Sequence, residues 1–330
     1  MSNGTDNLLL SIIIPTYKRC ELLTHLLEKI APEAEQLGIE VCVVDNCSAD
    51  GTAEQLAVLS AQYPSIRYKV NAETVSIDEN MRLAMQMANG IYVFPLGDDD
   101  CLPLGALISI IGELAHNPDM LSLGGQSIGA DYTPLPELQY SEDVFGQQFQ
   151  DPRKALLKLN VQPFGSFVIK RNIISDKAFS RYSGTCHAYL GVVWEGIAQK
   201  YIEQGTVLIR CSSKSLVYLN SGIEKTWNSS RLEVFFVKVP EYLKLLPDVL
   251  QAESKFLLDA WLGRYVNIIQ FIDLRRSKHL TPLNYREAQA LLDQKSAREM
   301  ALIMQIPVPL LKIFRSLIKR WRKLRTICSF

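Results

Sequence analysis

The stretch YVFPLGDDD, residues 92–100, decides the fold predicted for the first half of this chain. It is an apolar run of the length of a strand, and it ends in a glycine and three consecutive carboxylates. Adjacent aspartates repel one another, so a fold that gathers them at a strand end requires a counter-charge. A divalent cation can supply it, because Mg²⁺ is usually bound by one or two carboxylates together with phosphate oxygens. An acidic, solvated turn is the competing interpretation, and the rest of the chain decides between the two.

Two more apolar runs and a third short strand segment precede this stretch, and apolar residues at helical spacing lie between them. The predicted strands are Leu8–Ile14, Ile39–Val44, Ile66–Val70 and Ile91–Leu96. The repeated order of strand, loop and helix is typical of βαβ units and predicts a doubly wound α/β domain. In such a domain, ligands bind at the carboxyl ends of the strands.

Polar residues follow each of the four predicted strands. They are Thr16 and Tyr17 after the first strand, Asp45 after the second, Asn71 after the third and Asp98–Asp100 after the fourth. Because these four strand ends meet at one edge of the sheet, a binding site explains them better than a series of unrelated solvated turns.

Glycine-rich phosphate loops are absent from the sequence. There is no G-x-G-x-x-G after the first strand and no G-x-x-x-x-G-K-[ST] anywhere, which argues against a Rossmann dinucleotide site and a P-loop. A nucleotide whose phosphates are not held by such a loop can be held through a metal ion, for which the aspartates supply ligands. Asp45, with Asn46 beside it, can accept a hydrogen bond from a base or a ribose hydroxyl.

The composition is that of a globular protein. Of the 330 residues, 48% are hydrophobic and 21% are charged. No window approaches the roughly 20 apolar residues of a membrane-spanning helix, and no signal peptide is expected. The seven cysteines form no C-x-x-C pair, which favours free thiols in a reducing cytosol over disulfides or a zinc site.

The end of the chain is strongly basic, although the formal net charge of the whole chain is zero. Residues 300–330 contain seven basic residues and no acid. On a helical wheel, one face carries Leu310, Ile313, Phe314, Leu317, Trp321 and Leu324, and the other carries Lys312, Arg315, Lys319, Arg322 and Lys323. A basic amphipathic helix with aromatic residues on its apolar face predicts that 307–327 lie on an anionic membrane surface. A charged outer face of a packed helix is the alternative.

Three sequence motifs resemble those of glycosyltransferase family 2, whose members have the GT-A fold. The motifs are SIIIPTYKR at 11–19, VVDNCSADGT at 43–52 and ANGIYVFPLGDDDCL at 88–102. The G-D-D-D form of the third motif, with Asp78 and Asn80 ahead of it, most resembles O-antigen sugar transferases of the abequosyltransferase type. The resemblance implies a mixed Rossmann-like sheet flanked by helices.

The resemblance also implies roles for individual residues at the strand ends. Residues implied to bind the nucleotide sugar are Pro15, Thr16, Tyr17, Asp45, Asn71, Asp78, Asn80 and Asp98, with Asp45 holding the base. The implied metal site consists of Asp98, Asp99 and Asp100 and takes Mg²⁺ or Mn²⁺. Alignment with the D-x-D motif of the family makes Asp99 the principal ligand and puts Gly97 where the first aspartate often stands.

The second half of the chain is expected to supply the acceptor side. Residues 1–220 are predicted to form the GT-A domain, with a nucleotide-binding half at 1–122 and an acceptor half at 123–220. Within the acceptor half, 124–150 is expected to be a loop or flap that crosses toward the acceptor. Residues 221–330 are predicted to be helical.

Inverting glycosyl transfer requires a general base within hydrogen-bond reach of the acceptor hydroxyl. Two candidates lie near the start of the helix that is predicted to follow 184–189: His187, whose ordinary pKa is about 6.5, and Glu195. We favour His187, because its pKa suits the role and it lies at the junction of loop and helix. The alternative is that His187 caps the helix and Glu195 forms a structural ion pair. Asp176 is a more remote option.

The sequence therefore predicts an inverting glycosyltransferase that moves a sugar from a nucleotide-diphosphate donor to a saccharide hydroxyl. The expected acceptor is an oligosaccharide or a polyprenyl-diphosphate-linked unit at the cytoplasmic face of the inner membrane. A metal-dependent nucleotidyltransferase is one alternative, although no basic phosphate loop follows the first strand. A catalytically inactive, membrane-bound scaffold is another. Nucleic acid is not an expected partner.

Overall fold

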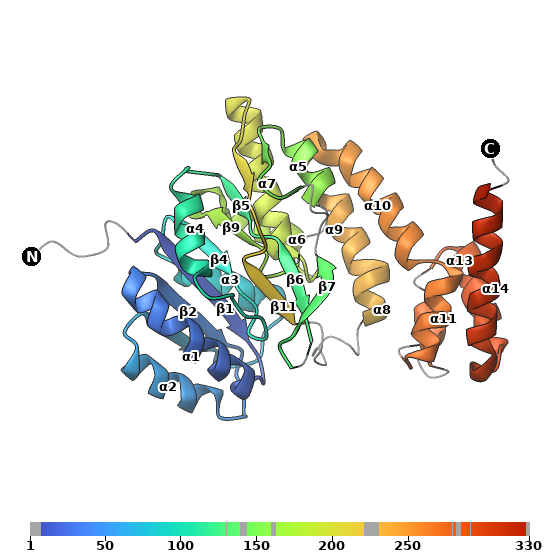
Figure 1. Cartoon of the computed structure of the whole chain (residues 1–330), viewed down its shortest axis with the longest axis horizontal. Helices are drawn as coiled ribbons and strands as arrows, with labels where there is room; N and C mark the ends of the chain where they lie inside the picture. Colours follow the sequence, from blue (N-terminus) through green and yellow to red (C-terminus); the bar gives the residue numbers. More distant parts are fainter. Residues whose placement is uncertain are drawn as a thin grey trace, which may run out of the picture. The chain divides into compact units, whose positions relative to one another are not determined.

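The computed structural model describes residues 8–129, 131–138, 144–159, 163–220, 231–278, 280–281, 285–290 and 292–327. These residues divide into two compact units (Figure 1). Unit 1 contains Met1–Ile223 and Leu245–Glu253, and unit 2 contains Glu224–Lys244 and Ser254–Phe330. The predicted boundary at 220/221 borders residues 221–230, which lie outside the described residues, so the assignment of that boundary stays a prediction.

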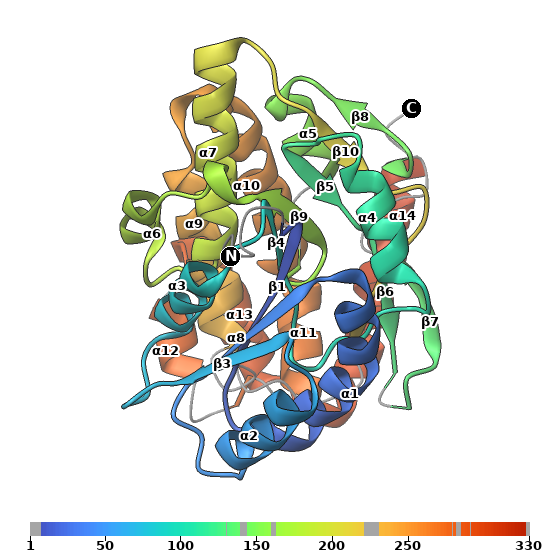
Figure 2. The ribbon, with the colours of Figure 1, turned by 90° about the vertical axis from the view of Figure 1, so that its left-hand side faces the viewer.

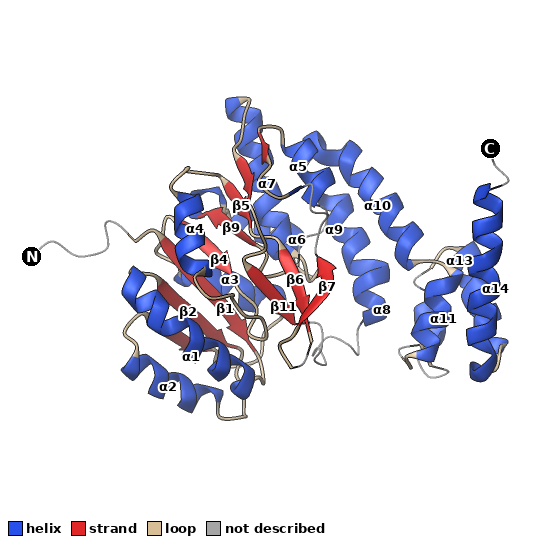
Figure 3. Cartoon of the chain, viewed as in Figure 1, coloured by secondary structure: helices blue, strands red, loops and turns tan. Residues whose placement is uncertain are grey.

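Unit 1 is built on a mixed sheet with the strand order β3-β2-β1-β4-β9-β5-β10-β8. The strands are β1 Leu10–Thr16, β2 Glu40–Asp45, β3 Ile66–Val70, β4 Tyr92–Pro95, β5 Met120–Ser122, β8 Gln148–Phe149, β9 Phe167–Lys170 and β10 Ile209–Cys211. The first four strands are mutually parallel, whereas β9 runs antiparallel to both β4 and β5. The predicted α/β class with a mixed, helix-flanked sheet is confirmed (Figure 3).

Helices cover both faces of this sheet (Figure 2). They are α1 Cys20–Leu37, α2 Thr52–Gln62, α3 Ile77–Met87, α4 Ala106–Leu114, α5 Pro152–Leu159, α6 Asp176–Tyr182 and α7 Ala188–Gln204, with 3₁₀ turns η2 Arg171–Ile173 and η5 Asp248–Leu250. Helices α1, α2 and α4 lie on one side, and α3, α6 and α7 on the other (Figure 2). Alternate residues of β1, such as Leu10, Ile12 and Ile14, join the core beneath α1 and α4. Burial on both faces explains why β1 and β2 are almost continuously apolar.

Proline 15 shapes the edge at which the predicted site lies. Strand β1 extends two residues beyond its predicted end and pairs with β2 as far as Thr16 and Asp45. On its other side, β1 pairs with β4 only as far as Ile13, which accepts a hydrogen bond from the Leu96 N–H at 2.9 Å. Because Pro15 has no N–H, this ladder cannot continue. The chain after β4 therefore separates from β1 and forms the aspartate turn.

The segment 124–150, expected to be a loop, contains short strands. Strands β6 Gly125–Ile128, β7 Pro134–Leu138 and β11 Val217–Asn220 form a second sheet in the order β11-β6-β7. Strand β8 belongs to the same segment and pairs with β10. The sequence did not reveal these strands because they are short and β7 begins with a proline, which weakens any periodic pattern. Residues 130 and 139–143 of this segment lie outside the described residues.

Unit 2 is helical. It contains α8 Arg231–Glu233, a π-helical turn η4 Val234–Lys238, most of α9 Val239–Leu245 and α10 Gln251–Tyr265, and then α11 Ile268–Arg276, α12 Tyr285–Ala290, α13 Gln294–Gln305 and α14 Val308–Ile327. Its core includes Phe236, Phe271, Met300 and Leu311. Among the described residues, none of the helices combines the length and the apolar character needed to cross a bilayer.

Helix α14 attaches to its unit by a different stripe from the apolar face that the sequence predicts. Leu311 is fully buried in the unit 2 core, and Arg315 donates a hydrogen bond to Asp273 of α11 at 2.8 Å. The predicted apolar face is exposed as far as its side chains are described: Leu310, Ile313, Phe314 and Leu317 have 42–58% of their surface accessible. Side chains from residue 319 onward, including that of Trp321, lie outside the described part.

Candidate active site

The aspartate turn follows β4 and is buried. Asp98, Asp99 and Asp100 are each only 7–8% exposed. The backbone N–H of Asp100 donates to the carbonyl of Gly97 at 3.3 Å, which closes the turn. A Cβ at position 97 would lie 2.5 Å from Asp100 Oδ2, so any larger residue requires the folded-back carboxylate of Asp100 to move. Three acidic groups are thus gathered within one tight turn.

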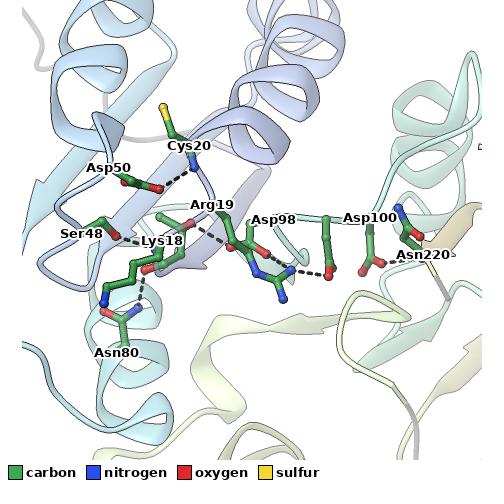
Figure 4. A network of polar contacts seen from close by, with 11 residues as sticks. Lys18, Arg19, Cys20, Ser48, Asp50, Asn80, Asp98, Asp100 and Asn220 are labelled. Carbon is green, nitrogen blue, oxygen red and sulfur yellow. Dashed lines mark hydrogen bonds and ion pairs between the residues drawn. The ribbon is translucent and has the colours of Figure 1, made fainter. Parts of the chain in front are cut away.

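Arg19 supplies a counter-charge to the first two aspartates (Figure 4). Its Nη1 lies 3.2 Å from Asp98 Oδ1 and also forms an ion pair with Asp99 Oδ2. Thr16 at the end of β1 donates through Oγ1 to Asp98 Oδ2 at 2.8 Å. Burial acts to lower the pKa of Arg19, but the carboxylates of Asp98 and Asp99 outweigh it and the pKa is raised. The guanidinium therefore stays charged and holds two carboxylates at the same point.

Asp100 is directed to a different part of the site. Its Oδ1 accepts a hydrogen bond from the backbone N–H of Asn220, at the end of β11, at 3.1 Å (Figure 4). Its Oδ2 lies against Gly165, where a Cβ would approach to 2.9 Å. Gly165 has φ +88°, in the left-handed region that favours glycine. Asp100 thus ties the turn to β11 and to the loop before β9.

A network of three asparagines joins the ends of the first three strands. Asn71 donates to Asn46 Oδ1 at 3.2 Å and to Asn80 Oδ1 at 2.9 Å. Asn80 in turn donates to the carbonyls of Val44 at 3.3 Å and Thr16 at 3.5 Å. These residues therefore fix the backbone on which the polar edge is built.

One carboxylate oxygen of Asp45 accepts no hydrogen bond from the described residues. The residue is completely buried, and its Oδ2 accepts from the backbone N–H of Ser48 at 3.1 Å. Within the described part of the chain, no donor reaches its buried Oδ1. A buried acceptor without a donor is costly. A ligand that brings an N–H or O–H group to Asp45 would remove that cost.

Pro15 and Tyr17 lie on the same edge. Pro15 and the buried Thr16 are the last residues of β1, and Tyr17 follows them, half-buried. Lys18 lies over the Tyr17 ring, with Nζ 5.0 Å from its centroid. Lys18 has φ +53°, and its N–H donates to Ser48 Oγ at 2.7 Å. The loops after β1 and β2 are thus fastened to each other.

Asp78 organises the loop that precedes α7. Its carboxylate accepts hydrogen bonds from the backbone N–H groups of Gly184 at 2.8 Å, Cys186 at 3.2 Å and Ala188 at 3.2 Å. Burial raises the pKa of Asp78, although these bonds act in the opposite direction. The loop makes a sharp turn in which Gly184 and Cys186 both have positive φ. In this structure the carboxylate of Asp78 therefore faces backbone groups around His187.

His187 is the N-cap residue of α7. Its Nδ1 lies 2.9 Å from the carbonyl of Thr185, and because a carbonyl only accepts, the neutral ring carries its proton on Nδ1. The lone pair is then on Nε2. Burial lowers the pKa of His187 from its usual 6.5, against the opposing effects of the Thr185 carbonyl and Asp78. A neutral imidazole with a basic Nε2 is the form that accepts a proton.

Aromatic contacts connect His187 to the aspartate turn. The His187 ring is stacked on Tyr189 at a centroid distance of 6.0 Å, and Tyr189 contacts Phe164 edge-on at 5.2 Å. Phe164 precedes Gly165, which lies against Asp100. His187 and the aspartates therefore belong to one continuous cluster of contacts.

Glu195 and Asp176 are engaged elsewhere. Both Glu195 oxygens are within 2.9 Å of Arg181 Nη1, and Oε2 also accepts from the Tyr182 hydroxyl at 2.8 Å. This is the structural ion pair considered as the alternative role of Glu195. Asp176 accepts from Gln86 on the exposed side of α3 at 3.3–3.4 Å.

The oxygen donors of Asp98 and Asp99 fit a divalent cation. Their carboxylates converge on a single point, which Arg19 Nη1 marks. In the described ranges, no three His, Cys, Asp or Glu side chains are grouped to hold a metal by themselves. Mg²⁺ and Mn²⁺ sites with few protein carboxylates are completed by water and substrate phosphates. The pair is thus suited to a cation that arrives with a phosphorylated ligand.

Two site residues were missed from the sequence. Arg19 lies within the first motif, but nothing in the sequence places it against acids 79 and 80 positions away. Tyr132 in the segment 124–150 packs on His25 and lies under Lys29. Burial raises the pKa of Tyr132, with smaller contributions from Cys101 and Asp99.

Comparisons with known proteins agree with this geometry. The sequence model described as glycosyl transferase family 2 matches residues 11–176. The chain is 26% identical over 260 residues to abequosyltransferase RfbV of Salmonella typhimurium, covering 73% of this chain and 75% of that protein. The crystal structure of residues 1–349 of TarS from S. aureus has a TM-score of 0.53 at 17% identity, covering 96% of this chain and 92% of that one. The same TarS fragment in complex with UDP-GlcNAc gives a TM-score of 0.54 at 16% identity.

Proposed function

Because the chain belongs to glycosyltransferase family 2 and is thus a sugar transferase, we propose that it transfers its sugar with inversion from a nucleoside-diphosphate donor. The proposed acceptor is a hydroxyl of a lipid-linked saccharide in the synthesis of a surface polysaccharide of the O-antigen type. The observation that carries this proposal is that the Asp45 oxygen, which no donor among the described residues reaches, and the Asp98–Asp99 pair lie at one edge of the sheet.

The donor nucleoside is assigned to the loops after β1 and β2. Asp45 Oδ1 accepts a hydrogen bond from the base or the ribose, and Pro15, Thr16 and Tyr17 form the adjoining wall. Asn71 and Asn80 hold these loops in place through the asparagine network. A nucleoside diphosphate also agrees with TarS, a protein of the same fold whose structure is described in complex with UDP-GlcNAc.

The donor diphosphate is assigned to the aspartate turn. Asp98 and Asp99 would hold Mg²⁺ or Mn²⁺ there, and Asp100 would fix the turn through Asn220. When bound, such a cation stabilises the negative charge that develops on the departing diphosphate.

His187 is assigned as the general base. Its Nε2 accepts the proton of the acceptor hydroxyl while that oxygen attacks the anomeric carbon from the side opposite the diphosphate, which inverts the configuration. The hydrogen bond from Nδ1 to the Thr185 carbonyl keeps the ring in the tautomer that this role requires. Asp78 acts as a positioning residue, because it fixes the backbone on both sides of the histidine.

The acceptor and the location are proposed from two observations. The relative from Salmonella typhimurium is named an abequosyltransferase. The proposed O-antigen unit as acceptor is based on the similarity of this chain to that protein. The exposed apolar face of α14, with basic residues on the same helix, supports attachment to an anionic membrane surface. We therefore place the enzyme at the cytoplasmic face of the inner membrane, where a polyprenyl-linked acceptor would be found.

The proposal is tested by nucleotide release from a panel of UDP-, dTDP-, GDP- and CDP-sugars with and without Mn²⁺. We expect divalent-dependent release with one donor, and its loss in Asp99→Ala and Asp45→Ala. Asp151→Ala is the matched control, because Asp151 follows β8 and pairs with Arg153, outside the loops that follow β1 to β4. An inactive scaffold would release no nucleotide with any donor, and that outcome would sink the proposal.

A further inference from the structure

A single nitrogen of Arg19 lies at the point where the carboxylates of Asp98 and Asp99 converge. Arg19 Nη1 is 3.2 Å from Asp98 Oδ1 and also contacts Asp99 Oδ2, and the side chains of all three residues are 9–11% exposed. A cation that bridges these two oxygens on the side that faces Arg19 would occupy the position of that nitrogen. The guanidinium and a divalent cation therefore cannot be bound there at the same time.

We propose that Arg19 is the resident counter-cation of the Asp98–Asp99 pair and that a divalent cation binds only by displacing it. This inference rests on the proposed function in taking the pair as the metal site. Without donor, Arg19 neutralises the two buried carboxylates. It thereby stabilises the turn and keeps the affinity of the pair for free metal low. The affinity of the site for metal is then set by an arginine and not by the aspartates alone.

The backbone around Arg19 is fixed, so the exchange involves its side chain. The N–H of Lys18 donates to Ser48 Oγ at 2.7 Å, and that of Cys20 donates to Asp50 Oδ2 at 3.1 Å (Figure 4). Both acceptors belong to the loop after β2, on the side assigned to the nucleoside. The long side chain can rotate about its own bonds while this backbone stays in place.

A donor diphosphate provides the displaced guanidinium with a new partner. Arginine binds phosphate oxygens through two parallel N–H bonds, which compensates for the lost contacts with the carboxylates. Metal and nucleoside diphosphate should therefore strengthen each other's binding, and the effect must be reciprocal. Removal of the guanidinium should weaken this coupling while making the metal bind more tightly by itself.

The test is a titration of wild type, Arg19→Gln and Arg153→Gln with Mn²⁺ alone. Binding is monitored as the loss of the free-ion signal in electron paramagnetic resonance. We expect Mn²⁺ to bind Arg19→Gln at least tenfold more tightly than wild type, and Asp99→Asn in the same background to abolish the gain. Arg153→Gln removes the same charge from an exposed ion pair and should behave as wild type. In the presence of UDP, dTDP, GDP or CDP, the Mn²⁺ affinity of wild type should rise more than that of Arg19→Gln.

A second measurement covers the case in which Arg19→Gln is poorly folded without metal. Its Tm should then rise steeply with Mn²⁺, whereas the Tm of wild type and Arg19→Lys should change little. Equal Mn²⁺ affinities and equal Tm shifts in wild type and Arg19→Gln would overturn the role of Arg19 but would leave the metal site of the proposed function in place. No Mn²⁺ binding to either protein, with any of the nucleotides, would overturn the metal site of the proposed function and this inference with it.

Discussion

Gly97 determines the geometry of the aspartate turn, although it carries no functional group. The resemblance to the family suggested that an aspartate is often found at this position. In this chain the carboxylate of Asp100 folds back over Gly97, and a Cβ there would lie 2.5 Å from Oδ2 and 3.0 Å from Cγ of Asp100. The space that a side chain at position 97 would need is thus used by the acid three residues later.

Substitution of Gly97 by alanine should therefore destabilise the protein. We expect Gly97→Ala to lower the free energy of unfolding by about 1–3 kcal/mol, the usual cost of an overpacked site. Gly112→Ala is the control, because a Cβ at this position in α4 meets no atom within 4 Å. Alanine there should be neutral or stabilise by about 0.5–1 kcal/mol. Urea unfolding of both variants checks this, and equal stabilities would contradict the crowding at Gly97.

His187 should give the reaction an acid limb below the usual histidine range. Burial lowers the pKa of His187 from 6.5, so the neutral ring persists to lower pH than in an exposed histidine. Protonation removes the Nε2 lone pair, so kcat/KM should be constant above the lowered pKa and fall as the pH drops through it. His187→Gln should reduce kcat by roughly 10²–10⁴-fold, the usual contribution of a general base. The measurement is the pH dependence of kcat/KM over roughly pH 4.5 to 8, an interval that includes the ordinary histidine pKa of about 6.5 and lower values.

The control for this profile is Glu195→Gln. Glu195 is bound by Arg181 and Tyr182, so its replacement should alter stability while leaving the acid limb in place. An acid limb that disappears in Glu195→Gln and persists in His187→Gln would reverse the assignment of the base.

At the scale of elements, the function depends on a contact between α3 and the loop before α7. Asp78 on α3 accepts three backbone hydrogen bonds from residues 184–188, including that of Ala188 in the first turn of α7. A carboxylate at a helix N-terminus is also favoured by the helix dipole. The position of His187 is therefore set by a residue more than 100 positions earlier in the chain.

Asp78→Ala should impair both folding and the chemical step. It leaves three N–H groups without their acceptor, which costs roughly 1–3 kcal/mol for each that stays buried. We expect lower kcat with unchanged KM for the donor, measured by steady-state kinetics alongside urea unfolding. Glu79→Ala is the matched control, since Glu79 pairs with Arg82 at the partly exposed surface of α3 and surface pairs contribute at most about 1 kcal/mol. A raised donor KM with unchanged kcat would instead support the donor-binding role that the family resemblance implied for Asp78.

At the scale of the whole molecule, the sheet was predictable because its strands have distinct sequence patterns. The runs that became β1, β2 and β4 are short and apolar, and β3 is short and mixed in character. Each is followed by polar residues, so their order and the site edge could be predicted. The structure brings Thr16 onto Asp98, a contact consistent with the expected meeting of strand ends. Periodicity and chain order were sufficient for this part of the site.

The uses of individual side chains could not be predicted in the same way. Arg19 contacts acids about 80 residues away, and Asp78 accepts hydrogen bonds from a loop more than 100 residues later in the chain. Such contacts depend on the direction of side chains in three dimensions, which periodicity does not determine. The short strands β6 and β7 also lack a clear pattern, because a strand of four or five residues alternates too few times.

The exposed face of α14 leads to a prediction for the behaviour of the whole protein at a membrane. Leu311 and Arg315 attach this helix to unit 2, so Ile313 and Phe314 are available for another surface. Vesicles of equal parts phosphatidylglycerol and phosphatidylcholine should bind the protein, and vesicles of phosphatidylcholine should bind it less. Each basic residue near an anionic surface contributes about 1 kcal/mol, an interaction that salt weakens.

The double variant Ile313→Glu with Phe314→Glu should reduce sedimentation with the anionic vesicles at least tenfold, because two carboxylates would have to enter the lipid interface. Leu302→Glu is the matched control, since Leu302 is an exposed leucine of α13 outside this face. Its binding should equal that of wild type, and all three proteins should unfold at similar urea concentrations, because none of the substituted side chains is buried. Equal vesicle binding by the double variant and the control would show that the apolar face of α14 meets another partner and would remove the membrane from the proposed function.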